Sequence, residues 1–184
     1  MVSVRWHASP LLDGFGTTAR GFCPGHFFWM QREIDITKET DMIYSAGTII
    51  IDDNPDLEEP HVLVVRAYAN WDFPKGHVEE GETLMGAAAR ETMEETELAW
   101  GVDYTMSGLE APNVTYGTGK RQKTAIYYLA DRTSDKDPFL PVSEELGKPE
   151  NDEWRWVPAS TLPELLPQRL QPVANYVVAW LTRS

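Results

Sequence analysis

The sequence predicts an α/β or α+β domain built on a mixed β-sheet. Two β-branched, apolar segments, residues 42–51 and 61–67, are typical of buried strands. A helix with small residues on one face follows, from Thr83 to about Trp100. Because strands come first, a helix lies between them and helices come last, we expect helices packed on a sheet.

Each element has its own local signal. The turn sequence Asp52-Asp-Asn-Pro joins the first two strands into a hairpin. Thr83 can cap the following helix, and Gly101 can terminate it. Residues 71–82 and 132–151 are rich in turn-forming residues and are expected to be loops. Further strands are expected near 103–111, 123–131 and 153–157, and helices near 160–166 and 170–182.

The chain of 184 residues fits one domain with an extension. Residues 1–41 are irregular and glycine-rich, but they contain several aromatic side chains. We therefore expect residues 1–41 to form an extension packed on a domain of residues 42–184.

Charge and composition exclude several classes of function. A net charge of −13 should repel duplex nucleic acid and anionic membranes. No apolar run is long enough for a membrane span. The single cysteine, Cys23, favours a reducing, cytoplasmic location.

The acidic residues gather on the expected helix. Glu91, Glu94 and Glu95 have i, i+3 and i+4 spacing, which places three carboxylates on one side of a helical turn. Arg90 can pair with Glu94 but cannot neutralise all three charges. Two interpretations stay open at this point: a solvated acidic face, or ligands for Mg²⁺ or Mn²⁺, which prefer such oxygen donors.

The loop before this helix favours the metal. Gly76, Glu82, Arg90, Glu91, Glu94 and Glu95 follow the order G-x5-E-x7-R-E-x-x-E-E, which resembles the Nudix box. The resemblance implies an α/β/α sandwich with a mixed central sheet that hydrolyses a nucleoside diphosphate linked to another group.

The resemblance also implies roles for these residues. Glu91, Glu94 and Glu95 would hold the metal together with Gly76, which would also allow a backbone turn. Arg90 would orient the carboxylates, and Glu82 would support the loop. A bound metal lowers the pKa of a water molecule, and a carboxylate takes its proton. Glu150 is either a surface charge or a further carboxylate of this site.

Two residues depart from the pattern. Thr92 stands where an aliphatic residue is usual, and its methyl group can still pack. Glu97 stands where the family has glycine, so we expect the helix to continue toward Gly101.

Other segments bear on the substrate. The loop Trp71-Asp-Phe-Pro-Lys-Gly-His-Val is similar to that of asymmetric diadenosine tetraphosphate hydrolases, as are the segments around residues 116–130 and 150–156. On this resemblance the partner is a small nucleotide, cleaved to ATP and AMP. Ammonium groups suit a flexible polyphosphate, and aromatic rings can stack on bases. The expected substrate contacts are Lys75, His77, Tyr116, Lys123 and Tyr127.

Three alternatives remain. A diphosphoinositol polyphosphate phosphohydrolase should need a broader basic surface than residues 120–123 provide. An RNA 5′-end pyrophosphohydrolase is disfavoured by the low basicity. A non-catalytic nucleotide-binding module should have lost its metal carboxylates, but all three are present. Oligomeric state is not predicted.

Overall fold

The computed structural model describes residues 43–119, 122–143 and 146–183. The extension expected over residues 1–41 lies outside the described residues, as do Lys120 and Arg121.

A mixed sheet forms the centre of the described domain. Its main strands run in the order β10-β2-β1-β7-β5. β1 and β7 pair in parallel, whereas the other pairs are antiparallel, so the predicted mixed sheet is confirmed. Three short strands extend it, with β3 beside β2, β4 beside β1 and β6 beside β7. The bounds are β1 Ile43–Asp52, β2 His61–Ala67, β3 Asn70–Asp72, β4 Lys75–His77, β5 Tyr104–Glu110, β6 Val114–Tyr116, β7 Lys123–Arg132 and β10 Glu153–Pro158.

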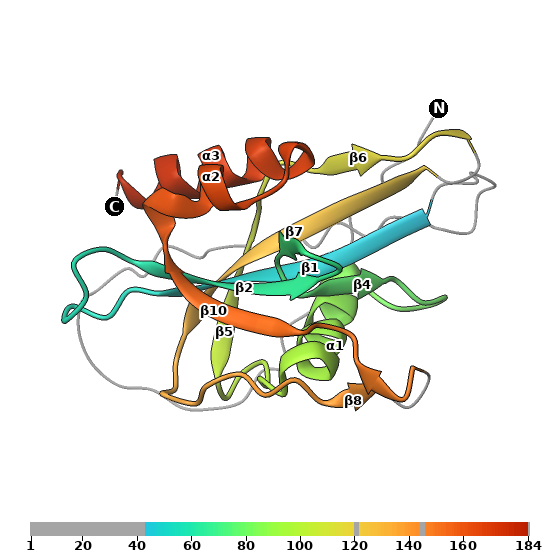
Figure 1. The fold of residues 1–184 in the computed structure, drawn as a ribbon, viewed down its shortest axis with the longest axis horizontal. Coiled ribbons are helices and arrows are strands. Elements are labelled where there is room, and N and C mark those ends of the chain that lie inside the picture. The colour runs from blue at the N-terminus through green and yellow to red at the C-terminus, as the bar shows by residue number, and fades with distance from the viewer. Residues whose placement is uncertain (1–42, 120–121, 144–145, 184) are drawn as a thin grey trace, which may run out of the picture. The chain divides into compact units, whose positions relative to one another are not determined.

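Helices cover both faces of this sheet (Figure 1). On one face, α2 (Leu162–Leu165) and α3 (Gln171–Leu181) bury Leu162, Val173 and Val177 against alternate residues of the strands. On the other face, α1 (Leu84–Thr96) packs against β1 through small residues such as Ala88. This arrangement is the expected α/β/α sandwich. In the described parts of the chain, no helix has the length and apolar character needed to span a membrane.

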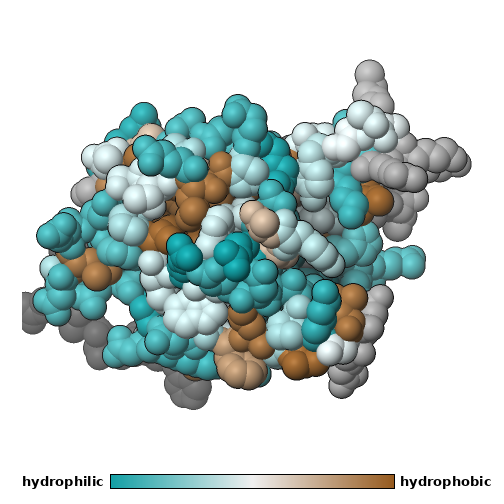
Figure 2. All heavy atoms as spheres, in the orientation of Figure 1, coloured by the Kyte–Doolittle hydropathy of each residue, from teal (hydrophilic) through white to brown (hydrophobic). Residues whose placement is uncertain are grey.

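The face of the molecule drawn in Figure 2 is mainly hydrophilic, and its hydrophobic side chains collect in a few small patches. Exposed apolar side chains include Phe139, Val142 and Leu146. Val142 and Leu146 belong to a feature that the sequence did not predict, a small hairpin of β8 (Val142–Ser143) and β9 (Lys148–Pro149) inside the expected loop 132–151. The expected loop 71–82 likewise contains β4 and the end of β3.

The expected continuation of the first helix is wrong. α1 ends at Thr96, and Glu97 adopts the left-handed conformation with φ of 57°. The Glu97 N–H donates to the Met93 carbonyl, and the Lys136 ammonium group donates to the Glu97 carbonyl. These bonds complete the helix end, so the turn that glycine usually allows is made here by a residue with a side chain. The backbone geometry is kept at the cost of steric strain.

This strain gives a stability prediction. Glu97→Gly should raise the free energy of unfolding by about 0.5–1 kcal/mol, because glycine adopts positive φ without a Cβ clash. Thermal denaturation of the two proteins measures the difference. Glu58→Gly is the matched control, since Glu58 is exposed and lies outside the positive-φ positions of the described chain. An equal or lower melting temperature for Glu97→Gly would contradict the interpretation.

Candidate functional site: a carboxylate cluster between two hollows

A close approach of two strands positions the site. Lys75 and Gly76 in β4 pair with Gly47 and Ala46 in β1. A Cβ atom on Gly47 would lie 2.4 Å from the Pro74 carbonyl oxygen and from the Lys75 Cβ. Only glycine lets this loop lie directly on β1, and the loop then faces the acidic side of α1.

Gly76 does not form the backbone turn that the sequence predicts. It lies in a strand and outside the positive-φ glycines. A Cβ atom at Gly76 would lie 1.9 Å from the Glu91 Oε2 atom. The absent side chain therefore makes room for the Glu91 carboxylate beside β4.

Arg90 joins the loop to the helix. Its Nε and Nη2 atoms each donate to Glu82 at 3.0 Å, and Nη2 also donates to the His77 carbonyl at 2.8 Å. Its Nη1 atom donates to Glu91 at 2.9 Å and to Glu94 at 3.1 Å. The Glu82 hydrogen bonds raise the pKa of Arg90, so the guanidinium stays charged. This arrangement fits the orienting role expected of Arg90 and the loop-supporting role expected of Glu82.

Glu95 lies on the other side of the cluster, toward Lys75. Its Oε2 atom accepts a hydrogen bond from the Lys75 backbone N–H at 3.3 Å. Burial raises the pKa of Glu95 to about 8, although Lys75 and Asn151 act against that change. Burial also raises the pKa of Glu91, and the charges of Glu94 and Glu150 contribute. The fold thus holds acidic groups where ionisation is unfavourable in the absence of a cation.

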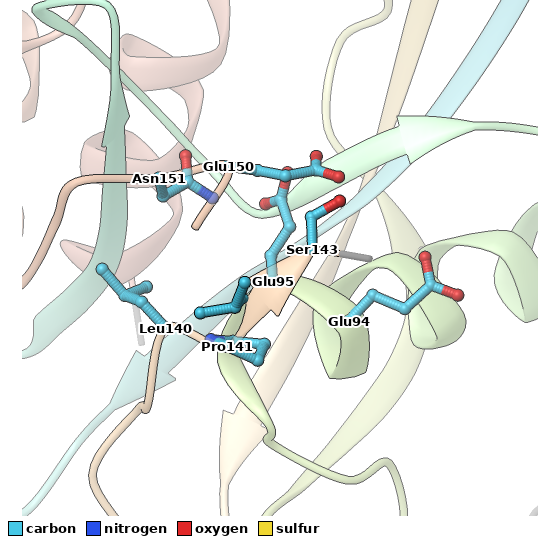
Figure 3. A pocket seen from close by; sticks show the side chains of 8 residues that line it. Glu94, Glu95, Leu140, Pro141, Ser143, Glu150 and Asn151 are labelled. Carbon is cyan, nitrogen blue, oxygen red and sulfur yellow. The ribbon is translucent and has the colours of Figure 1, made fainter. Parts of the chain in front are cut away.

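Glu150 reaches this cluster from a distant part of the sequence. Together with Glu94 and Glu95 it lines a cavity of about 420 Å³, which we call the acidic hollow. Figure 3 shows Glu95 extending from α1 toward Glu150 and Asn151, whereas the Glu94 carboxylate points away from them. The remaining lining residues are Leu140, Pro141, Val142, Ser143 and Asn151.

The chemistry of these residues fits a divalent cation. Glu94, Glu95 and Glu150 line one hollow, and Glu91 is close enough to feel the charges of Glu94 and Glu150. Burial disfavours the ionised form of Glu91 and Glu95, so a bound cation would relieve the electrostatic cost. Among the described residues, however, no group of three His, Cys, Asp or Glu side chains has a preformed metal-binding arrangement. Arg90 already binds Glu91 and Glu94. Binding a metal therefore requires these side chains to rearrange.

A second cavity, of about 260 Å³, adjoins the first and also contains Glu95 and Asn151. We call it the basic hollow, because Lys75 and Arg169 line it. Both cations contact Asp72, Lys75 at 3.3 Å and Arg169 at 2.6 Å. Asp72, Asn151 and Arg169 are site residues that the sequence did not predict. In the sequence Asp72 lies near Lys75 and Asn151 follows Glu150, so their neighbours could have pointed to them. Arg169 lies in no motif and beside no predicted site residue.

Tyr127 does not lie where a substrate could reach it, so the predicted substrate contact of this residue is wrong. Its side chain has 0% exposure, and its ring packs edge-on against Phe73 at 5.5 Å between centroids. The hydroxyl donates to Asp72 at 2.8 Å. Tyr127 is a core residue that holds Asp72 in place.

The other expected substrate contacts lie nearer the surface. Tyr116 in β6 is partly buried and pairs with Lys123, an exposed residue at the start of β7. The Arg169 guanidinium lies over the Tyr116 ring, 5.6 Å from its centroid. His77 points an exposed side chain away from the core, and its backbone carbonyl serves Arg90.

Thr92 fits its unusual position through its hydroxyl group as well as its methyl group. The side chain has 0% exposure between α1 and β1. Its hydroxyl donates to the Ala88 carbonyl at 2.7 Å and lies 2.9 Å from the Thr48 hydroxyl. A polar group thus replaces an aliphatic one without being left unsatisfied.

The chain is similar in sequence to known proteins. Asymmetrical bis(5′-nucleosyl)-tetraphosphatase from Rattus norvegicus is 34% identical over 105 residues, covering 57% of this chain and 67% of that protein. An RNA pyrophosphohydrolase from Dinoroseobacter shibae is 32% identical over 110 residues, covering 53% of this chain and 66% of that protein. The chain therefore spans about two thirds of the length of these relatives.

The fold has a counterpart among solved structures. A binary complex of Caenorhabditis elegans Ap4A hydrolase superposes with a TM-score of 0.65 and 23% identity, covering 77% of this chain and 99% of that one. At this identity the likeness concerns the fold. The NUDIX domain model matches residues 43–181, which include the whole carboxylate cluster and both hollows. The chain belongs to the Nudix hydrolase family.

Proposed function

We propose that the protein hydrolyses a dinucleoside polyphosphate in a metal-dependent reaction, with asymmetric cleavage of diadenosine tetraphosphate to ATP and AMP. The observation that carries the proposal is the convergence of Glu91, Glu94, Glu95 and Glu150 beside an open cavity, next to cationic side chains. The first group suits a cation, and the second suits a chain of phosphates.

The reaction needs one water molecule and forms no covalent enzyme intermediate. The water oxygen bonds to a phosphorus atom, the phosphoanhydride bond to the leaving nucleotide breaks, and the water proton passes to a carboxylate. Bound Mg²⁺ or Mn²⁺ supplies charge neutralisation at phosphorus and lowers the pKa of the water. Glu91, Glu94 and Glu95, with the Gly76 backbone beside them, are the residues that would hold the ion.

Glu150 is the proposed proton acceptor. Its side chain is exposed and makes no hydrogen bond or ion pair with the described residues, whereas Arg90 engages both Glu91 and Glu94. A carboxylate without a partner keeps its lone pairs available for a proton. Arg90 is then a positioning residue, because it fixes the helix carboxylates through the bonds described above.

The substrate assignment depends on the end of the sheet near β6. Tyr116 and Lys123 face each other across β6 and β7, which gives one aromatic ring and one ammonium group at a common edge. A base with an attached phosphate chain needs both features. His77, exposed beside the loop, is a further proposed contact.

A substrate panel tests the proposal directly. The purified protein with Mg²⁺ is incubated with dinucleoside polyphosphates, nucleoside triphosphates, diphosphoinositol polyphosphates and RNA with a 5′-triphosphate. We expect fastest turnover of diadenosine tetraphosphate, with ATP and AMP as products. Preferred release of pyrophosphate from RNA, the activity named for one relative, would reject the substrate assignment.

Glu94→Gln should abolish turnover, with a loss of at least about a hundredfold in kcat. The Glu94 side chain is 58% exposed, so its substitution should change the melting temperature of the metal-free protein little. Added Mg²⁺ should raise the melting temperature of the unaltered protein by mass action and raise that of the variant less. Glu80→Gln, an exposed acidic loop residue, is the control. Near-normal activity of Glu94→Gln would remove it from the mechanism.

The buried carboxyl group of Glu95 predicts a dependence of stability on pH. Its pKa rises from an ordinary value of 4.5 to about 8 on folding, so between these values the folded protein binds more protons than the unfolded chain. The stability of the metal-free protein should therefore fall as the pH rises from about 5 to 8. Chemical denaturation at several pH values measures this fall, and Glu95→Gln should reduce it. An equal slope in both proteins would contradict the assignment.

Tyr116→Ala should raise KM for diadenosine tetraphosphate severalfold and lower kcat less, because a contact with a base is similar in the ground and transition states. Lys123→Ala should also lower kcat somewhat, since charge grows on the phosphate chain as the bond breaks. Tyr176→Ala is the control, because Tyr176 also packs at the edge of the core, on α3. Unchanged steady-state kinetics for Tyr116→Ala would exclude base stacking.

A further inference from the structure

The basic hollow contains two cations that share a single anchor. Lys75 and Arg169 both contact the Oδ2 atom of Asp72, and its Oδ1 atom accepts from the Tyr127 hydroxyl and the Phe73 N–H. The Asp72 carboxylate is therefore saturated. Two positive charges against one buried negative charge leave an excess of positive charge in this group.

Arg169 retains unused hydrogen-bond donors. A guanidinium has five N–H donors, and the contact with Asp72 is the one hydrogen bond found for Arg169 in the described part of the chain. The side chain is 33% exposed, so its remaining donors are accessible from the hollow. Such a fixed and partly free guanidinium is well suited to bind a phosphate oxygen.

Asn151 provides an independent observation. It is 5% exposed and lines both hollows, and its side chain acts on the Glu95 carboxylate, but its Nδ2 atom makes no hydrogen bond of normal geometry with the described residues. A buried amide donor that is poorly satisfied costs free energy, and a phosphate oxygen in the hollow would satisfy it. In Figure 3 its amide lies on the side of the cavity that Glu95 and Glu150 share.

Ring, ion-pair and strand contacts connect these groups to Tyr116 and Lys123 at the edge of the sheet. Lys123 pairs with Tyr116, Arg169 lies over the Tyr116 ring, and Asp72 links Arg169 to Lys75. The Lys75 backbone N–H then reaches Glu95, at the edge of the acidic hollow. A series of contacts thus leads from the sheet edge to the carboxylates.

We propose that Arg169 and Asn151, together with Lys75, form a phosphate subsite in the basic hollow that holds the polyphosphate chain between the sheet edge and the carboxylates. The identity of the substrate in this subsite rests on the proposed function. The subsite itself should bind any chain of phosphates. The carboxylates of Asp72 and Glu95 also line it. Asp72 is saturated by its own partners, and Glu95 marks the end that adjoins the reaction centre.

Inorganic tripolyphosphate tests the subsite without turnover. Calorimetric titration into the full chain in the absence of metal should show binding that Arg169→Gln weakens about tenfold, as expected for the loss of a charge-assisted hydrogen bond. Asn151→Ala should weaken it severalfold. Arg155→Gln is the matched control, because Arg155 is an exposed arginine outside both hollows that pairs with Glu153.

Kinetics separate binding from a structural effect. For diadenosine tetraphosphate, Arg169→Gln should raise KM about tenfold and change kcat less than about threefold, and Arg169→Lys should recover part of the loss. Asn151→Ala breaks no ion pair, so it tests the same subsite if Arg169→Gln folds poorly. Tripolyphosphate binding that both variants retain at the unaltered affinity would overturn the proposal. If the unaltered protein binds tripolyphosphate through these residues but does not cleave the dinucleotide, the subsite stands and the proposed function fails.

Discussion

Arg90 is the residue on which the geometry of the site depends. One guanidinium binds the loop carboxylate Glu82, the His77 carbonyl and two helix carboxylates. Without it, adjacent negative charges on α1 would repel one another, and the loop would lose its connection to the helix. The same positive charge also competes with any cation for Glu91 and Glu94. A bound metal would consequently have to displace part of the contact between Arg90 and these two carboxylates.

The two hollows differ in the charge of the side chains that line them. Carboxylates with unfavourable ionisation gather on one side, and anchored cations gather on the other, with Glu95 and Asn151 common to both. Asp72 makes this separation possible, because it fixes Lys75 and Arg169 within the reach of a single carboxylate. A protein of strongly negative net charge can therefore present positive charge to an anionic ligand at one place.

Much of the fold and of the carboxylate cluster could be predicted from the sequence. Periodicity located β1, β2 and α1, and helical spacing placed Glu91, Glu94 and Glu95 together. The predicted end of α1 was wrong because a glutamate at position 97 favours continuation of the helix, whereas the contacts that Glu97 makes in the folded protein favour a turn. The predicted substrate contact of Tyr127 was wrong because strand alternation shows that neighbouring residues point to opposite faces of the sheet, but not what packs against each face. Arg169 lies about one hundred residues from Asp72, and pairings at that distance leave no local pattern.

The parallel pairing of β1 with β7 has a consequence for how the protein folds. It joins residues about eighty positions apart, from Ile43 with Lys123 to Ile51 with Asp131. Box residues from Gly76 to Glu95 lie within the segment that this pairing closes. Closing so long a loop loses chain entropy before its contacts can form, which slows folding. Helical spacing brings Glu91, Glu94 and Glu95 together as soon as α1 forms, whereas Glu150, which follows β7 in the sequence, joins them only when the long-range contacts are made.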